Sequence, residues 1–141
     1  MKTLKIATLT FLIVLAASCS KNDTNDDIPV QEVPEVTTSD LLVSGKWYIN
    51  GATGISLNSC MKEGYFHFVD SDTLLIETFD LSGGDCVSNG LESYTYLVND
   101  SLINVFYSGN STTLTIDFIS ESQLVLSTES GGSTFTYNLI H

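Results

Sequence analysis

The chain has 141 residues, of which 43% are hydrophobic, and a formal net charge of −12, so it has the size of one modest domain with enough apolar side chains for a core. It contains 5 Lys, no Arg and 17 acidic residues. Neutralising the phosphates of a nucleic acid requires a basic patch, which this composition cannot supply, so nucleic acid is excluded as a partner.

The amino terminus has the pattern of a secretion signal. Residues 1–5 are short and basic, and residues 6–17 form a mainly apolar run that is too short to cross a bilayer. Residues 15–19, with the sequence LAASC, resemble the lipobox of bacterial lipoproteins, in which the Cys becomes the acylated first residue. We therefore expect a lipoprotein signal peptide over residues 1–18 and a membrane anchor on Cys19. An ordinary cleavable signal followed by an unrelated Cys is the alternative.

The segment 19–40 differs sharply in composition from the apolar run before it. It is rich in Asp and Glu, contains two Pro and has no aromatic residue, so it predicts a disordered acidic tether. Its first residues, 19–23 (CSKND), resemble the signals that follow the Cys in surface-exported lipoproteins of Bacteroidota. This resemblance implies an outer-membrane protein that is exposed on the cell surface, with the periplasmic face as the alternative.

The remaining segment, 41–141, alternates between apolar and polar residues with a period of two. Short strands joined mainly by tight turns predict an all-β fold, an eight-stranded antiparallel up-and-down meander. Closing such a sheet into a barrel removes its exposed edges. One longer connection is expected over 82–91. The predicted strands span 45–50, 64–69, 73–80, 92–98, 101–107, 112–119, 123–129 and 133–140.

The alternation also predicts which side chains point into the barrel. A two-residue turn at 99–100 would pair Tyr96 with Ile103, which places Val105 and Tyr107 inside and Phe106 outside. A one-residue bulge in this strand would reverse that assignment. Seven aromatic rings are expected to point inward. They are Trp47, Phe66, Phe68, Tyr94, Tyr96, Phe135 and Tyr137.

The start of the first strand carries a family resemblance. Gly45-Lys46-Trp47, ahead of an eight-stranded meander with a Cys pair, resembles the Gly-x-Trp opening of lipocalins. The whole of 41–141 is similar to the small lipocalin-like lipoproteins of Bacteroidota. The resemblance implies that Gly45 and Trp47 form a plug at the closed end of the barrel. In lipocalins an Arg from a late strand covers this Trp, and the present chain has no Arg.

Two cysteines remain once Cys19 is assigned to the anchor. Cys60 and Cys86 form an even pair in an exported domain, which favours a disulfide between two rim loops. The alternative, a metal site, would need two more ligands, and only His67 and His141 are available as histidines. We therefore expect a disulfide and no metal.

The sequence leaves two functions open. The first, implied by the lipocalin resemblance, is binding of a small apolar or amphipathic ligand inside the barrel. The second is a filled barrel that acts as a structural or protein-interaction module of the envelope. A cavity of about 300 Å³ or more would favour the first. No catalytic motif is present, so neither an enzyme nor a cofactor is expected. The candidates to line a cavity are Phe66, Phe68, Tyr94, Tyr96 and Tyr137.

Overall fold

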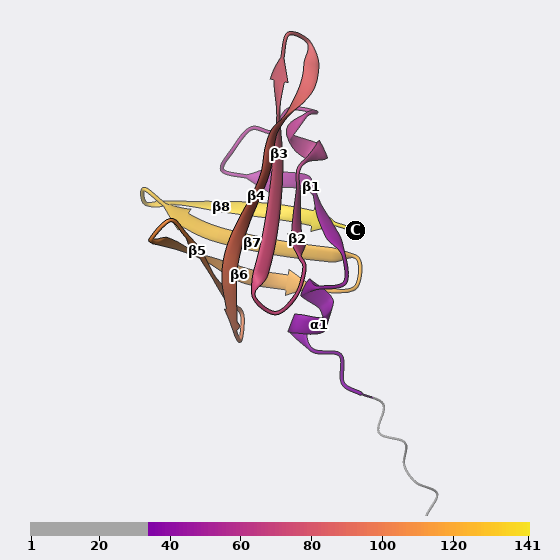
Figure 1. The fold of residues 1–141 in the computed structure, drawn as a ribbon, viewed down its shortest axis with the longest axis vertical. Helices are drawn as coiled ribbons and strands as arrows, with labels where there is room; N and C mark the ends of the chain where they lie inside the picture. The colour runs from indigo at the N-terminus through magenta and orange to yellow at the C-terminus, as the bar shows by residue number, and fades with distance from the viewer. Residues whose placement is uncertain (1–33) are drawn as a thin grey trace, which may run out of the picture. The chain divides into compact units, whose positions relative to one another are not determined.

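The computed structural model describes residues 34–141, and Pro34–His141 form one compact unit (Figure 1). The expected signal peptide, Cys19 and most of the expected tether lie outside the described residues. In chain order the elements are α1 (Thr38–Leu42), β1 (Lys46–Thr53), the short 3-10 helix η1 (Met61–Glu63), β2 (Tyr65–Phe68), β3 (Thr73–Ser82), β4 (Asp85–Asn99), β5 (Leu102–Tyr107), β6 (Asn110–Ile119), β7 (Gln123–Ser130) and β8 (Ser133–Ile140).

The strands of the described chain close into a barrel of eight, as the period-two pattern predicts. Each strand pairs antiparallel with the next one in sequence, and β1 also pairs with β8. The predicted fold class is therefore confirmed. Every strand finds its partners within residues 34–141, so this segment holds the complete sheet and its core. We use it as an independently folding unit in the experiments below.

Helix α1 begins in the last residues of the segment expected to be a tether, 19–40, and runs on to Leu42. The Thr37 hydroxyl accepts a hydrogen bond from the Asp40 amide at 3.2 Å, and the Asp40 carboxylate accepts one from the Thr37 amide at 2.9 Å. This reciprocal capping box satisfies amides that a short helix would otherwise leave free. The helix buries Leu42 completely in the barrel core. In residues 34–141 no helix is long and apolar enough to cross a membrane.

The turn between β4 and β5 lies one residue later than predicted. Tyr96 pairs with Val105, and Asn99 pairs with Leu102, so Asp100 with φ 53° occupies the turn. The register is therefore two residues away from the predicted one. A shift of two leaves each side chain on the same face of the sheet. Accordingly Val105 is buried and Phe106 is exposed, as predicted.

The expected loop over 82–91 is wrong, because this segment is a β-hairpin. Strands β3 and β4 continue past the barrel and pair as far as Ser82 and Asp85 (Figure 1). The two turn residues, Gly83 and Gly84, adopt φ values of 65° and 100°, which only Gly tolerates readily. The hairpin has solvent on both faces, so the alternation of apolar and polar residues that identifies a strand is missing there.

Candidate functional site

The closed end of the barrel is built around Trp47. Its side chain is fully buried, and its indole nitrogen donates a hydrogen bond to the Leu42 carbonyl at 3.0 Å. This bond ties α1 across the base of the barrel and satisfies the one polar atom of the indole. Trp47 is therefore a member of the buried core that is held against α1, and its role as a plug stays a prediction.

The side chain that covers Trp47 comes from the last residue of the chain. The rings of Trp47 and His141 are 3.8 Å apart between centroids, with planes tilted by 39°. The Ser44 hydroxyl and Nε2 of His141 are 2.7 Å apart and share a hydrogen bond. A Cβ at Gly45 would come within 3.1 Å of the His141 ring, so Gly45 leaves room for this cover. The imidazole of His141 therefore packs on the Trp47 ring and is held there by Ser44.

The open half of the barrel contains a hollow of about 360 Å³ that is open to solvent at its mouth, and it is called the chamber below. All of its lining side chains lie at inward-facing strand positions, and seven strands, β2 to β8, contribute to it. The chamber lies at the end opposite α1, toward the rim that carries the β3–β4 hairpin. Its lining residues are Phe66, Ile76, Tyr94, Val105, Tyr107, Thr112, Leu114, Thr128 and Tyr137.

Three of the five predicted cavity residues line this chamber and two do not. Phe66, Tyr94 and Tyr137 line it. Phe68 and Tyr96 belong instead to the packed closed half, where their rings meet edge to face at 5.1 Å and the Tyr96 hydroxyl donates to the Asp70 carbonyl. Each is two residues along its strand from a lining residue, which displaces it by about 7 Å along the barrel.

The sequence did not single out the aliphatic part of the lining. Ile76, Val105 and Leu114 supply it from three different strands. The period-two pattern placed all three side chains inward, but it contained no signal for their height in the barrel. Tyr107 was predicted to lie inside, and it does line the chamber, although it is 46% exposed because it stands at the mouth.

The mouth of the chamber is aromatic and acidic. The rings of Tyr94 and Tyr107 meet edge to face with centroids 5.8 Å apart. The Tyr94 hydroxyl donates a hydrogen bond to the Glu92 carboxylate, and this bond raises the pKa of Tyr94 to about 12. Tyr94 is therefore protonated at neutral pH, and its hydroxyl proton is held by Glu92.

No charged side chain lines the chamber. Within residues 34–141 the lysines are Lys46 and Lys62. Lys46 lies on the outer face of the barrel wall, with its ammonium group 3.8 Å from the centroid of the Tyr65 ring, and Lys62 lies in η1. The interior therefore offers an anionic ligand no counter-charge.

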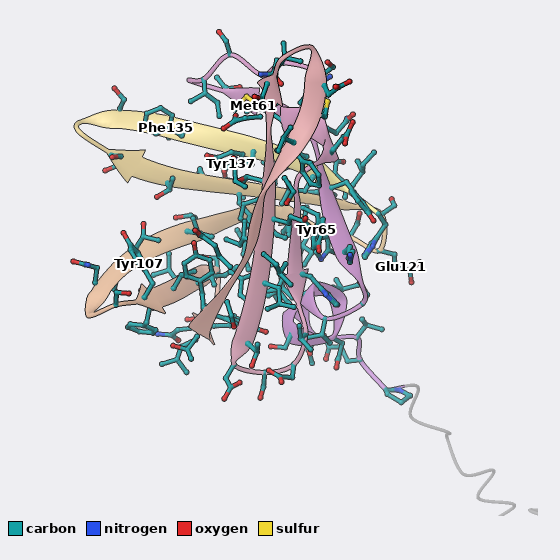
Figure 2. All side chains as sticks on the ribbon, turned by 45° about the horizontal axis from the view of Figure 1, so that its top comes forward. Met61, Tyr65, Tyr107, Glu121, Phe135 and Tyr137 are labelled. Atoms are coloured by element: carbon teal, nitrogen blue, oxygen red, sulfur yellow. A yellow bond between two sulfur atoms is a disulfide. The ribbon has the colours of Figure 1, made fainter. Side chains whose placement is uncertain are left out.

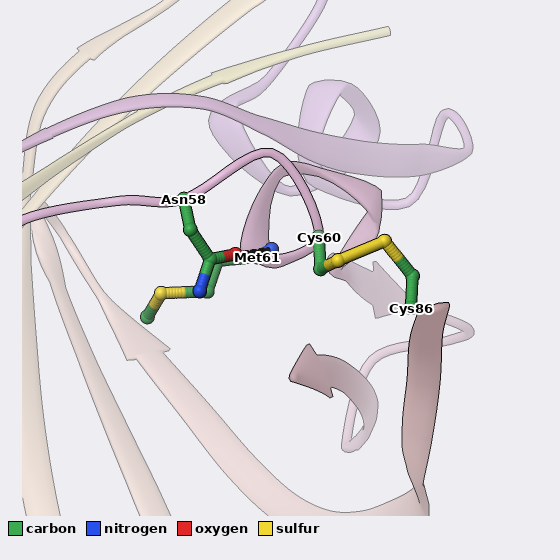
Figure 3. The surroundings of a disulfide bond; sticks show 4 residues. All are labelled: Asn58, Cys60, Met61 and Cys86. Carbon is green, nitrogen blue, oxygen red and sulfur yellow. Dashed lines mark hydrogen bonds between the residues drawn. A yellow bond between two sulfur atoms is a disulfide. The ribbon is translucent and has the colours of Figure 1, made fainter. Parts of the chain in front are cut away.

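The predicted disulfide is present at the rim (Figure 3). Cys60 and Cys86 are bonded with an S–S distance of 2.02 Å and Cα atoms 5.1 Å apart. Next to it, the Asn58 side chain accepts a hydrogen bond from the Met61 amide at 2.9 Å, which orders the chain as it enters η1. The bond links the segment before η1 to strand β4 in the protruding hairpin. It therefore joins a loop to a strand, whereas the sequence predicted a bond between two loops.

Comparisons with known proteins found several solved structures that are similar to this chain. A lipocalin-like protein from Bacteroides uniformis ATCC 8492 is similar in crystal structure, with 15% identity and a TM-score of 0.46 over 70% of this chain and 97% of that one. Bovine odorant binding protein in complex with its natural ligand has 20% identity and a TM-score of 0.42 over 77% of this chain and 76% of that one. Comparison with curated protein sequences finds no match.

The family model described as a lipocalin-like domain matches residues 43–126. The match begins at the end of α1, includes the Gly-x-Trp opening with its buried Trp47, and ends within β7. It spans more than half of the chain and seven strands of a closed antiparallel meander. On this evidence the chain belongs to the lipocalin-like domain family.

Proposed function

We propose that this chain is a lipid-anchored envelope protein whose barrel captures a small, uncharged apolar or amphipathic molecule. The observation that carries the proposal is the chamber of about 360 Å³ in the open half of the barrel. It exceeds the lower limit of about 300 Å³ that is typical of small-molecule sites. A filled barrel with a purely structural role, the alternative that the sequence left open, would have side chains in this space.

The lining of the chamber selects for an uncharged ligand. Four aromatic rings and three aliphatic side chains supply most of the surface, and the hydroxyl groups of Tyr and Thr supply the polar atoms. An anion buried there would lose its hydration with no opposite charge to compensate, and the carboxylate nearest to the lining, that of Glu92, already accepts the hydrogen bond of the Tyr94 hydroxyl. Free fatty acids are therefore disfavoured relative to neutral molecules of the same length.

Filling the chamber is expected to abolish binding of an apolar probe. Ile76 lines the chamber from β3, and Ile76→Trp would place an indole in the space of the ligand. We expect the affinity of residues 34–141 for N-phenyl-1-naphthylamine to fall at least about tenfold in a fluorescence titration, because the added ring and the probe compete for one volume.

The matched control for this variant is Leu97→Trp. Leu97 lies on the outer face of β4 and is 59% exposed, so the new indole would remain in solvent. We expect this control to bind the probe as the unmodified chain does and to unfold at a similar temperature. Equal affinities for all three proteins would refute ligand capture in the chamber.

The membrane anchor is proposed from the lipobox-like sequence at residues 15–19. We propose attachment to the outer membrane through acyl chains on Cys19, with the barrel on the cell surface. Replacing the acylated thiol removes the anchor, so Cys19→Ser is expected to shift the protein from the membrane fraction to the soluble fraction. Unchanged membrane association would contradict the anchor, and resistance to protease in intact cells would contradict surface display.

A further inference from the structure

Strands β6 and β7 form an incomplete seam in the barrel wall. Their pairing runs from Ile119 and Leu124 to Thr115 and Ser127 and goes no further in the described chain. Toward the open end β6 stays paired with β5 as far as Asn110, while β7 stays paired with β8. The two hairpins therefore diverge, and Figure 2 shows their separated tips, which carry Tyr107 and Phe135.

The space between the diverging hairpins is a polar cleft of about 460 Å³. Seven of its eight lining residues are Ser or Thr, and the eighth is Glu129. One hydrogen bond crosses the cleft, from the Thr128 hydroxyl to the Thr113 carbonyl at 2.9 Å. Beyond this bond the facing edges of β6 and β7 lack a ladder partner in the described sheet. The cleft thus combines side-chain hydroxyls with unpaired strand edges.

The cleft and the apolar chamber share part of their walls. Thr112 and Thr128 line both. The alternation of the strands explains this, because both residues point inward at the inner margin of the cleft, whereas Ser127 and Thr134 are at outward-facing positions. The chamber and the cleft are therefore neighbours, and a molecule with its apolar part in the chamber would extend its other end sideways between β6 and β7 past the Thr128–Thr113 hydrogen bond.

The chemistry of the cleft determines which group it would accept. Ser and Thr hydroxyls both donate and accept hydrogen bonds, so they complement a group that does the same. Neither lysine of the described chain lines the cleft, and its only charged side chain is the acidic Glu129. An anionic group would be repelled there, and a quaternary ammonium group could not use the hydroxyls.

We propose that the β6–β7 cleft is a head-group site, which receives the uncharged, polyhydroxylated head of an amphiphile whose apolar part occupies the chamber. This proposal rests on the proposed function, because it assumes that the chamber holds the apolar part. It adds the chemical class of the ligand, a neutral amphiphile of the glycoside type, and a lateral position for its head.

The test compares three amphiphiles that share one octyl chain, each below its critical micelle concentration. Octyl β-D-glucoside, octanoate and octyltrimethylammonium are titrated into residues 34–141 by calorimetry. We expect the glucoside to bind about tenfold more tightly than either ion, because its hydroxyls replace water with several neutral hydrogen bonds. Equal affinity of the glucoside and octanoate would overturn the proposal. Tighter binding of the ammonium compound would also overturn it, because Glu129 would then dominate recognition.

A double variant removes hydroxyls from the cleft without touching the chamber. Ser127→Ala with Thr134→Val is expected to weaken the glucoside about three- to tenfold and to leave the affinity for N-phenyl-1-naphthylamine unchanged. Its matched control is Ser93→Ala with Thr95→Val, which makes the same two changes on the exposed face of β4. An equal effect of the two double variants on the glucoside would refute the head-group site.

The two proposals fail in distinguishable ways. If the unmodified protein does not bind N-phenyl-1-naphthylamine, capture in the chamber is wrong and the head-group site falls with it. If the probe binds and is displaced equally well by all three octyl compounds, the chamber holds a ligand but the cleft does not select its head.

Discussion

Trp47→Ala is expected to lower the free energy of unfolding by about 3–5 kcal/mol, the range for removing a fully buried aromatic side chain. The loss combines two effects, because the substitution leaves a cavity at the base of the barrel and deprives the Leu42 carbonyl of its hydrogen bond. His141 would also lose the ring on which it packs. Such a loss is a large part of the total stability of a small domain. Urea denaturation of residues 34–141, followed by circular dichroism, measures it.

Two further variants separate the parts of this effect. Trp47→Phe keeps a buried ring but loses the N–H donor, so it should cost less than the Ala variant and still leave the Leu42 carbonyl unpaired. The control is Tyr48→Ala, because Tyr48 follows Trp47 in β1 and its side chain lies on the outer face of the barrel. Tyr48 is 42% exposed, and we expect a change within about 1 kcal/mol. A Trp47→Ala protein as stable as the control would contradict the plug role.

Removing the disulfide is expected to cost about 3–4 kcal/mol in the chain-entropy model, because it releases a loop with a sequence separation of 26. The double variant Cys60→Ala with Cys86→Ala makes this change without leaving an unpaired thiol. We expect a lower urea midpoint and faster hydrogen exchange in η1, since the bond holds the chain next to this helix against the hairpin.

Chemical reduction of the unmodified protein provides the control for this variant. Tris(2-carboxyethyl)phosphine should shift the urea midpoint of the unmodified chain toward that of the double variant and leave the variant itself unchanged. A reductant-sensitive midpoint in the double variant would show that another process is responsible. Coincident midpoints of the oxidised chain and the variant would refute a stabilising role of the bond.

The disulfide and the plug illustrate what local sequence chemistry can predict. Once Cys19 is set aside as the expected anchor, Cys60 and Cys86 are the one remaining pair of cysteines, and the bond between them is present. The Gly-x-Trp sequence placed Trp47 at the start of β1, where it is buried. Both predictions depend on residue type and position alone. The cover of the plug was not predictable in this way, because His141 reaches Trp47 only when β8 closes the barrel against β1.

The lining of the chamber shows where this kind of prediction ends. Phe66 and Phe68 have the same alternation and the same chemistry, yet Phe66 lines the chamber and Phe68 fills the core. Tyr94 and Tyr96 divide in the same way. Alternation assigns a side chain to a face of the sheet, and both members of each pair are on the inner face. Height within the barrel is a separate property.

The sequence by itself determined the class of the fold, the inward and outward faces of most strands, the burial of Trp47 and the disulfide, because each of these depends on patterns within one strand or on the chemistry of a residue pair. Only the tertiary structure decided the position of the chamber, the split between β6 and β7 and the cover on Trp47. The physical reason is that the height of a side chain along the barrel axis depends on the registers of all the strand pairs around the barrel. A turn that moves by one residue, as at Asp100, shifts the pairing of its two strands by two residues.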